Sequence, residues 1–102
     1  MITIGKKWDK GAIYIGRGSP LGNPFVMQSE EDRDFVCDKY QEWFDAQINQ
    51  KNEVVLKELR RIYNIAKHQD VILGCYCYPK RCHGETIKRF LDKYLDKEKH
   101  AT

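Results

Sequence analysis

The stretch VILGCYCYPKRCHG, residues 71–84, decides the fold of this chain. It begins as a nearly continuous apolar run, which is typical of a strand buried on both faces of a parallel sheet. Pro79 ends the run, and apolar side chains at helical spacing from Ile87 to Leu95 predict a helix after it. Ligand sites of small α/β proteins lie where such a strand gives way to a helix, so we expect the function here.

Upstream of this stretch, the pattern predicts two helices preceded by two short strands. Residues 30–49 and 53–67 carry apolar side chains at helical spacing, and Ser29 is a candidate N-cap for the first of these helices. Residues 2–4 and 12–16 are rich in β-branched and aromatic side chains, which favours strands. The two helices connect strands of one sheet by a parallel crossover.

These elements predict one α/β domain over residues 1–102, with a core over about 2–96 and a charged C-terminal tail at 97–102. We expect a small Rossmann-like parallel (or mixed) sheet of about three strands with three helices. The segments that follow residues 16 and 77 then lie at the carboxyl ends of neighbouring strands, where open α/β sheets hold their ligands.

The composition narrows the class of protein. No apolar run reaches the roughly 18 residues of a membrane span, and the N-terminus lacks the apolar stretch of a signal peptide. We therefore expect a cytoplasmic protein without membrane contact. The net charge is +3, with six basic and eight acidic side chains in residues 1–50 but twelve and seven in residues 51–102. This asymmetry favours an anionic ligand near the C-terminal half but lacks the dense basic stripe of a duplex-binding domain, so a nucleic-acid partner is not expected.

The segment RGSPLGNPF, residues 17–25, is too rich in glycine and proline for regular structure. Arg17 leaves the strand end where its guanidinium could hold an anion in a bidentate contact. Asn23 is fixed between Gly22 and Pro24, which would aim its amide at a base or sugar. Ser19 completes the predicted ligand-binding side chains of this loop. The alternative is a structural turn that tucks Leu21 and Phe25 into the core.

The segment before the last helix offers a second group of candidates. His83 could donate to an anion or act as an acid or base near neutral pH, and Gly84 would let a ligand approach the backbone amides. Glu85 is a candidate general base, although an acid in the first turn of a helix also stabilises the helix dipole. Lys80 and Arg81 add positive potential, but charged side chains in an exposed turn are common.

The cysteines allow three interpretations. In a reducing cytosol the four thiols stay free, although the spacing would allow a bridge between Cys77 and Cys82. Cys82, just before a helix N-terminus, and Cys77, at the strand end, are candidate nucleophiles. Zinc is a weaker alternative, with Cys75, Cys77, Cys82 and His83 as its ligands, because the C-x-C-x4-C-H spacing is poor for a tetrahedral site. The third interpretation treats Cys75 and Cys77 as small buried apolar groups.

Two motifs, IYIGRGSPLGNPF and LGCYCYPKRCHGETI, give the chain a family resemblance from about Ile13 to Leu91. The chain resembles a small domain-of-unknown-function family of bacteriophages and bacteria. Tyr76 and Glu85 depart from the Trp and Asp that this family more often has. The resemblance implies a Rossmann-like fold, a frequent phage origin and convergence of the motif residues on one pocket, namely Arg17, Asn23, Cys77, Cys82, His83 and Glu85. It implies no activity.

We therefore expect a pocket for a nucleotide-like, phosphorylated or ribosylated small molecule. The protein could act on this ligand by hydrolase or glycosyl-transfer chemistry, or it could bind the ligand without catalysis. The alternative is a phage effector that binds a host protein without catalysis. Exposed apolar surface on the helices, away from the motif loops, would favour that alternative. A nucleic-acid binder would need Lys80, Arg81, Lys88 and Arg89 on one positive face.

Overall fold

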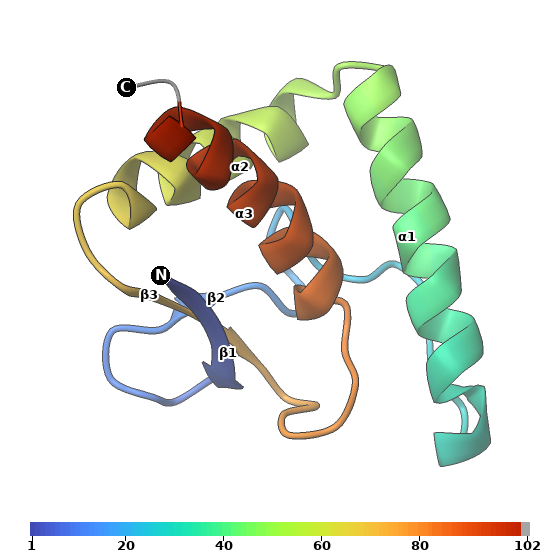
Figure 1. Ribbon diagram of the computed structural model, residues 1–102. Coiled ribbons are helices and arrows are strands. Elements are labelled where there is room, and N and C mark those ends of the chain that lie inside the picture. The colour runs from blue at the N-terminus through green and yellow to red at the C-terminus, as the bar shows by residue number, and fades with distance from the viewer. Residues whose placement is uncertain (101–102) are drawn as a thin grey trace.

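The computed structural model describes the backbone of residues 1–100 and the side chains of residues 1–97. Within this range, the chain is an α/β fold with a three-stranded parallel sheet and three α-helices, as predicted. The elements in chain order are β1 (Ile2–Lys6), β2 (Ile13–Tyr14), the 3-10 helix η1 (Glu30–Asp32), α1 (Arg33–Asn49), α2 (Glu53–Ala66), β3 (Val71–Cys75) and α3 (Gly84–His100) (Figure 1).

The strand order is β1-β3-β2, and both outer strands run parallel to β3. The register pairs Ile2 with Val71 and Ile13 with Leu73. The central position of β3 explains its apolar sequence, because neighbouring strands flank it and both of its faces are covered. The segments that leave β2 and β3 therefore start at the same edge of the sheet.

The short connection between β1 and β2 crosses β3 on the face opposite the helices. Val71 and Leu73 point into the core beneath α2 and α3, so Gly74 faces the other way. A Cβ atom at Gly74 would lie 3.0 Å from the Cα of Lys7 and 3.1 Å from the Cβ of Ala12. The crossing chain therefore needs a glycine at this position in the middle strand.

The helices pack on one face of the sheet and form the second layer of the fold. Helix α3 contacts β1 and β3, and α2 contacts β3, while α1 stands against the other two helices (Figure 1). The core between these elements contains Tyr40, Phe44 and Ile62, each at most 1% exposed. Phe44 of α1 meets Phe90 of α3 edge to face, with ring centroids 5.3 Å apart.

Several predicted boundaries are wrong, and β1 runs to Lys6 instead of ending at residue 4. Strand β3 ends at Cys75 instead of 77, because its partner β1 ends at Lys6, opposite Cys75. Strand β2 is limited to Ile13–Tyr14. Ser29 is extended, but its side chain makes no capping hydrogen bond, and the chain enters α1 through η1.

The predicted tail at 97–102 is helical as far as His100, and residues 101–102 lie outside the described part of the chain. No helix in the described part combines the length and the apolar character needed to cross a membrane.

Candidate functional site

A cavity of about 230 Å³ opens at the carboxyl edge of the sheet. Residues 16–27, which follow β2, and residues 75–83, which end β3 and lead to α3, line it from two sides. The start of α1 closes the third side with Arg33, Val36 and Cys37. Figure 1 shows the two loops meeting near the first turn of α3. The structure therefore brings the two distant motifs of the sequence to one place.

Arg17 and His83 line this same cavity from opposite loops. The Arg17 side chain is exposed and has no hydrogen-bond or ion-pair partner among the described residues. The other two arginines of the cavity are paired: Arg33 makes two hydrogen bonds to Glu30, and Arg81 pairs with carboxylates of α1. Arg17 is therefore the arginine of this cavity whose guanidinium remains available to an anion.

His83 is buried, with 7% of its surface exposed, and it connects β2 to α3. Its Nε2 atom lies 2.6 Å from the carbonyl oxygen of Ile15, to which it donates. Its ring stands edge to face against Tyr40, with centroids 4.9 Å apart. Burial lowers the pKa of His83, while the hydrogen bond to Ile15 opposes that shift. The ring is thus a neutral donor that fixes the geometry of the cavity.

Two thiols form the floor of the cavity. The Sγ atoms of Cys75 and Cys82 are 3.0 Å apart, and both residues are buried. The contact with the Cys82 thiol and hydrogen bonds from the backbone amides of Tyr78 and Cys77 lower the pKa of Cys75 to about 6. Burial and the adjacent Cys75 sulfur raise the pKa of Cys82. The two shifts have opposite signs, so Cys75 is the more acidic thiol of the pair.

The low pKa of Cys75 was not predicted, because the sequence pattern treated this residue as a core filler or a zinc ligand. The turn after β3 places two backbone amides at its sulfur, whereas Cys82 receives one, from Gly84 at 3.4 Å. Cys75 ends β3 directly before a turn, whereas the sequence placed the end of this strand at residue 77, so the pattern gave no signal for these amide contacts. Burial and the Cys75 sulfur raise the pKa of Cys82, the cysteine predicted as a nucleophile.

Arg33 is a second residue that the sequence pattern did not single out. Its guanidinium binds Glu30, contacts the side chain of Cys77 and donates to the carbonyl of Arg81, 2.9 Å away. These contacts attach the start of α1 to the loop that follows β3. Cys77 and Arg81 are far from Arg33 in the sequence, so no local spacing could have predicted these two contacts. Cys77 itself lines the cavity and is partly exposed.

The polar side chains of the first loop hold the loop together. The Oγ atom of Ser19 donates to the carbonyl of Gly16 at 2.7 Å, and Asn23 accepts from the amide of Phe25 at 2.9 Å. A Cβ atom at Gly22 would lie 2.5 Å from the Gly16 carbonyl oxygen, which shows how tightly the loop closes. Asn23 lines the cavity and its amide nitrogen remains for a ligand, whereas Ser19 has a structural role.

Four further candidates face away from the cavity or are engaged elsewhere. A Cβ atom at Gly84 would meet the side chains of Ile15 and Cys82, at 3.0 and 3.3 Å, so this glycine permits close packing of α3 on the sheet. Glu85 is exposed and lies 3.7 Å from Arg81. Lys80 pairs with Glu30 at 3.3 Å. Arg81 lines the cavity, but its guanidinium pairs with Asp34 and Asp38 of α1.

The positions of these side chains also bear on the zinc and nucleic-acid alternatives. Among the side chains of residues 1–97, no group of three or more His, Cys, Asp or Glu is placed to hold a metal ion. The four cations expected to form a positive face are each partnered: Lys80 and Arg81 as described, Lys88 with Asp92, and Arg89 with the side-chain oxygen of Gln41. Lys80, Arg81 and Lys88 are therefore paired with carboxylates, whereas Gln41 is neutral and leaves the charge of Arg89 without a counter-charge.

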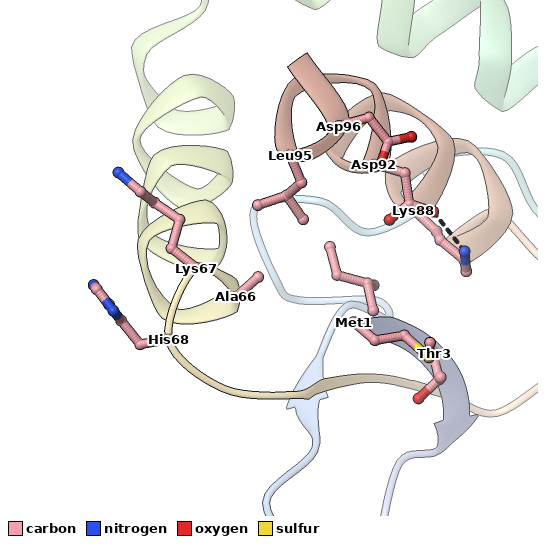
Figure 2. A pocket seen from close by; sticks show the side chains of 10 residues that line it. Met1, Thr3, Ala66, Lys67, His68, Lys88, Asp92, Leu95 and Asp96 are labelled. Carbon is pink, nitrogen blue, oxygen red and sulfur yellow. Dashed lines mark hydrogen bonds and ion pairs between the residues drawn. The ribbon is translucent and has the colours of Figure 1, made fainter. Parts of the chain in front are cut away.

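A larger hollow, of about 680 Å³, lies at the opposite edge of the sheet (Figure 2). It is framed by the start of β1, the end of α2 and the middle of α3, with Met1, His68 and Leu95 among its lining residues. Lys88 and Asp92, which also line it, form an ion pair with each other. This hollow is at the amino ends of the strands, away from the loops that carry the two motifs.

The fold and the cavity define a small α/β protein whose parallel sheet holds a thiol-containing, arginine-lined cavity at its carboxyl edge. The chain belongs to the family described as Domain of unknown function (DUF4326), which it matches over residues 3–93. This range includes both motif loops and every residue that lines the cavity. Comparison with curated proteins and with solved structures gives no match.

Proposed function

We propose that the cavity at the carboxyl ends of β2 and β3 binds a small anionic ligand of nucleotide-like, phosphorylated or ribosylated type. The observation that carries this proposal is the unpartnered Arg17 guanidinium on a cavity whose other arginines are paired. A guanidinium binds a phosphate or carboxylate in a bidentate contact. The amide nitrogen of Asn23, from the same loop, supplies a second donor for a sugar or phosphate oxygen.

The size of the cavity indicates which part of such a ligand lies inside it. Pockets for drug-sized ligands measure about 300–1,000 Å³, whereas this cavity measures about 230 Å³. It suits a phosphate or a phosphorylated ribose better than a whole nucleotide. Phe25 and Tyr76 also line it and are 37% and 64% exposed. A base that projects from the cavity would stack on these rings.

The cavity also contains a group that could act on a bound ligand. The Cys75 thiolate is a nucleophile at the floor, and a nucleophile could serve the hydrolase or glycosyl-transfer chemistry considered from the sequence. Glu85, one of the predicted catalytic residues, is engaged with Arg81 outside the cavity and has no part in this proposal. Analysis of the ligand after incubation with the protein distinguishes an enzyme from a binding protein.

Thermal-shift screening tests the binding proposal. The panel contains inorganic phosphate, ribose 5-phosphate, adenosine, AMP, ATP and ADP-ribose. A ligand present at about 100 times its Kd stabilises the folded protein by roughly 2.7 kcal/mol, so the phosphorylated compounds should raise the melting temperature by several degrees, and adenosine should not.

The matched variants are Arg17→Ala and Lys57→Ala. Loss of a charge-assisted contact costs about 1.5–3 kcal/mol, so Arg17→Ala should bind the hit ligand about tenfold to a hundredfold more weakly. Lys57 is exposed on α2, far from the cavity in the sequence and the fold, and its variant loses the same charge. Equal weakening in both variants would show that net charge, and not the cavity, attracts the ligand.

Docking on a host protein is the second candidate. An apolar groove of about 290 Å³ between α2 and α3 favours it, with Leu56, Leu59, Tyr63, Phe90 and Tyr94 among its lining residues. This groove lies on the helices, away from the motif loops. Substitution of Tyr94 by Lys would abolish such docking and leave the thermal shift by phosphorylated ligands unchanged.

A further inference from the structure

The floor of the cavity contains a pair of thiols whose chemistry does not depend on the ligand. Cys75 ends β3 and Cys82 lies two residues before α3, and the turn between them returns the chain so that the two sulfur atoms lie 3.0 Å apart. A disulfide needs a separation of about 2.05 Å, so the atoms have to approach by only about 1 Å. Both ends of the turn are anchored in regular structure, which keeps the pair together.

We propose that Cys75 and Cys82 form a reversible redox pair, oxidised to an intramolecular disulfide by peroxides and reduced again by thiols. This site is independent of the proposed ligand. The sequence spacing allows Cys77 as a partner of Cys82. Instead, the structure turns the Cys77 side chain toward the guanidinium of Arg33. The proposed partner is therefore the residue that the sequence pattern assigned to the core.

The surroundings of the two thiols give each of them a different role in the reaction. Cys75 accepts hydrogen bonds from two backbone amides, which stabilise its thiolate, and its Sγ atom lies 3.0 Å from that of Cys82. Burial and the adjacent Cys75 sulfur raise the pKa of Cys82. Cys75 is thus the sulfur that meets the oxidant, and Cys82 is the resolving thiol. Both residues are buried within the protein but line the cavity, through which a small peroxide can reach them.

The two steps balance with hydrogen peroxide as the oxidant. The Cys75 thiolate attacks one peroxide oxygen, the O–O bond breaks, and hydroxide leaves, so that Cys75 becomes a sulfenic acid. The sulfur of Cys82 then attacks the sulfur of Cys75, the S–O bond breaks, and water leaves with the proton of Cys82. The hydroxide takes up the proton that Cys75 released earlier. Two thiols have lost two electrons, and the peroxide has been reduced to two molecules of water.

Cys37, one of the two other cysteines of the cavity, provides an internal comparison. Cys37 of α1 is buried, and burial raises its pKa, so it lacks the thiolate character of Cys75. It lines the same cavity and is exposed to the same oxidant. The oxidant should therefore oxidise the Cys75–Cys82 pair and leave Cys37 unchanged. The reason is the stable thiolate of Cys75 and its short distance to Cys82, and not only the access of the oxidant to the cavity.

Peptide mapping after oxidation tests this proposal. The intact protein is treated with hydrogen peroxide, the remaining thiols are blocked with N-ethylmaleimide in denaturant, and the chain is digested with trypsin. Cleavage after the basic residues separates Cys75 and Cys77, on peptide 68–80, from Cys82, on peptide 82–88. The expected product is a cross-linked pair of these peptides with one maleimide on Cys77, about 2 Da lighter than the sum of peptide 82–88 and the singly blocked peptide 68–80, and released by dithiothreitol.

The variants Cys75→Ser, Cys77→Ser and Cys82→Ser identify the partner. The cross-link should persist in Cys77→Ser, which leaves the buried pair intact, and disappear in Cys75→Ser and Cys82→Ser. Persistence in Cys75→Ser would overturn the proposal, because Cys77 would then be the partner. The proposal would also be overturned if the cross-link were absent from both the wild-type protein and Cys77→Ser. Circular dichroism would first show that both proteins are folded. Peptide 34–39 should carry Cys37 in the blocked thiol form.

Discussion

His83 is of a residue type that often acts as an acid or base, but in this protein it has a structural role in the site. It lies against Tyr40 and donates from Nε2 to the carbonyl of Ile15, so it joins the end of β2 to the start of α3. The Tyr40 hydroxyl donates to the carbonyl of Leu21, 2.7 Å away, and burial raises its pKa, which keeps it a neutral donor. Together these two side chains hold the first loop against the helices.

The pH dependence of stability should reveal this role of His83. Because its pKa in the folded protein is lower than the ordinary value of 6.5, the unfolded chain binds more protons as the solution becomes acidic. This contribution to stability is complete above about pH 6.5 and is lost as the pH falls below that value. The loss for one group is at most about 1.4 kcal/mol per pH unit.

Urea unfolding at a series of pH values from about 7.5 to 5.5 measures this loss. In His83→Gln, whose amide can still donate to Ile15, the free energy of unfolding should fall less steeply than in the wild-type protein. His68→Gln removes an exposed histidine and should leave the wild-type slope. Equal slopes in the wild-type protein and in His83→Gln would contradict a buried, neutral His83.

At the scale of elements, the closure of the first loop positions Arg17. The amide of Ser19 donates to the carbonyl of Gly16 at 3.0 Å, and the amide of Gly22 donates to the carbonyl of Ser19 at 3.1 Å. The backbone thus turns twice within seven residues and returns to its starting point. Only a residue without a side chain fits at Gly22, against the Gly16 carbonyl.

Gly22→Ala should therefore open this loop. The added methyl group would overlap backbone atoms, and relief of such overlap costs about 1–3 kcal/mol. We expect lower stability and weaker binding of the phosphorylated hit ligand, measured by urea unfolding and by calorimetry. Gly11→Ala is the matched control, since its Cβ atom would meet nothing within 4 Å, although its φ of +79° makes alanine strained. If Gly11→Ala weakened binding as much, loop closure would not be the cause.

The sequence predicted these elements well where their signals are local. Helical spacing located α1 and α2 to within a few residues, and the apolar run at 71–75 identified the central strand. The end of β3 was missed because it depends on where the partner strand β1 stops. The 3-10 entry to α1 was missed because Ser29 has the residue type of an N-cap but its side chain does not bond to the helix.

At the scale of the whole molecule, parallel pairing of β2 and β3 accounts for the site. The two motifs are some 60 residues apart in sequence, and they meet because their strands are neighbours and point the same way. The sequence could therefore predict that the motifs converge. It could not predict which side chains face the cavity, since the ion pairs of Arg81 join distant elements and the low pKa of Cys75 depends on how the turn after β3 folds.

The most direct test of the account is an NMR titration of 15N-labelled protein with ADP-ribose and, separately, with inorganic phosphate. If the ligand binds in the cavity, the amide chemical-shift changes should concentrate in residues 15–25 and 75–84. These changes should be lost in Arg17→Ala but kept in Lys57→Ala. Shifts confined to the α2–α3 groove or to the hollow of Figure 2, with none in these two segments, would contradict the account.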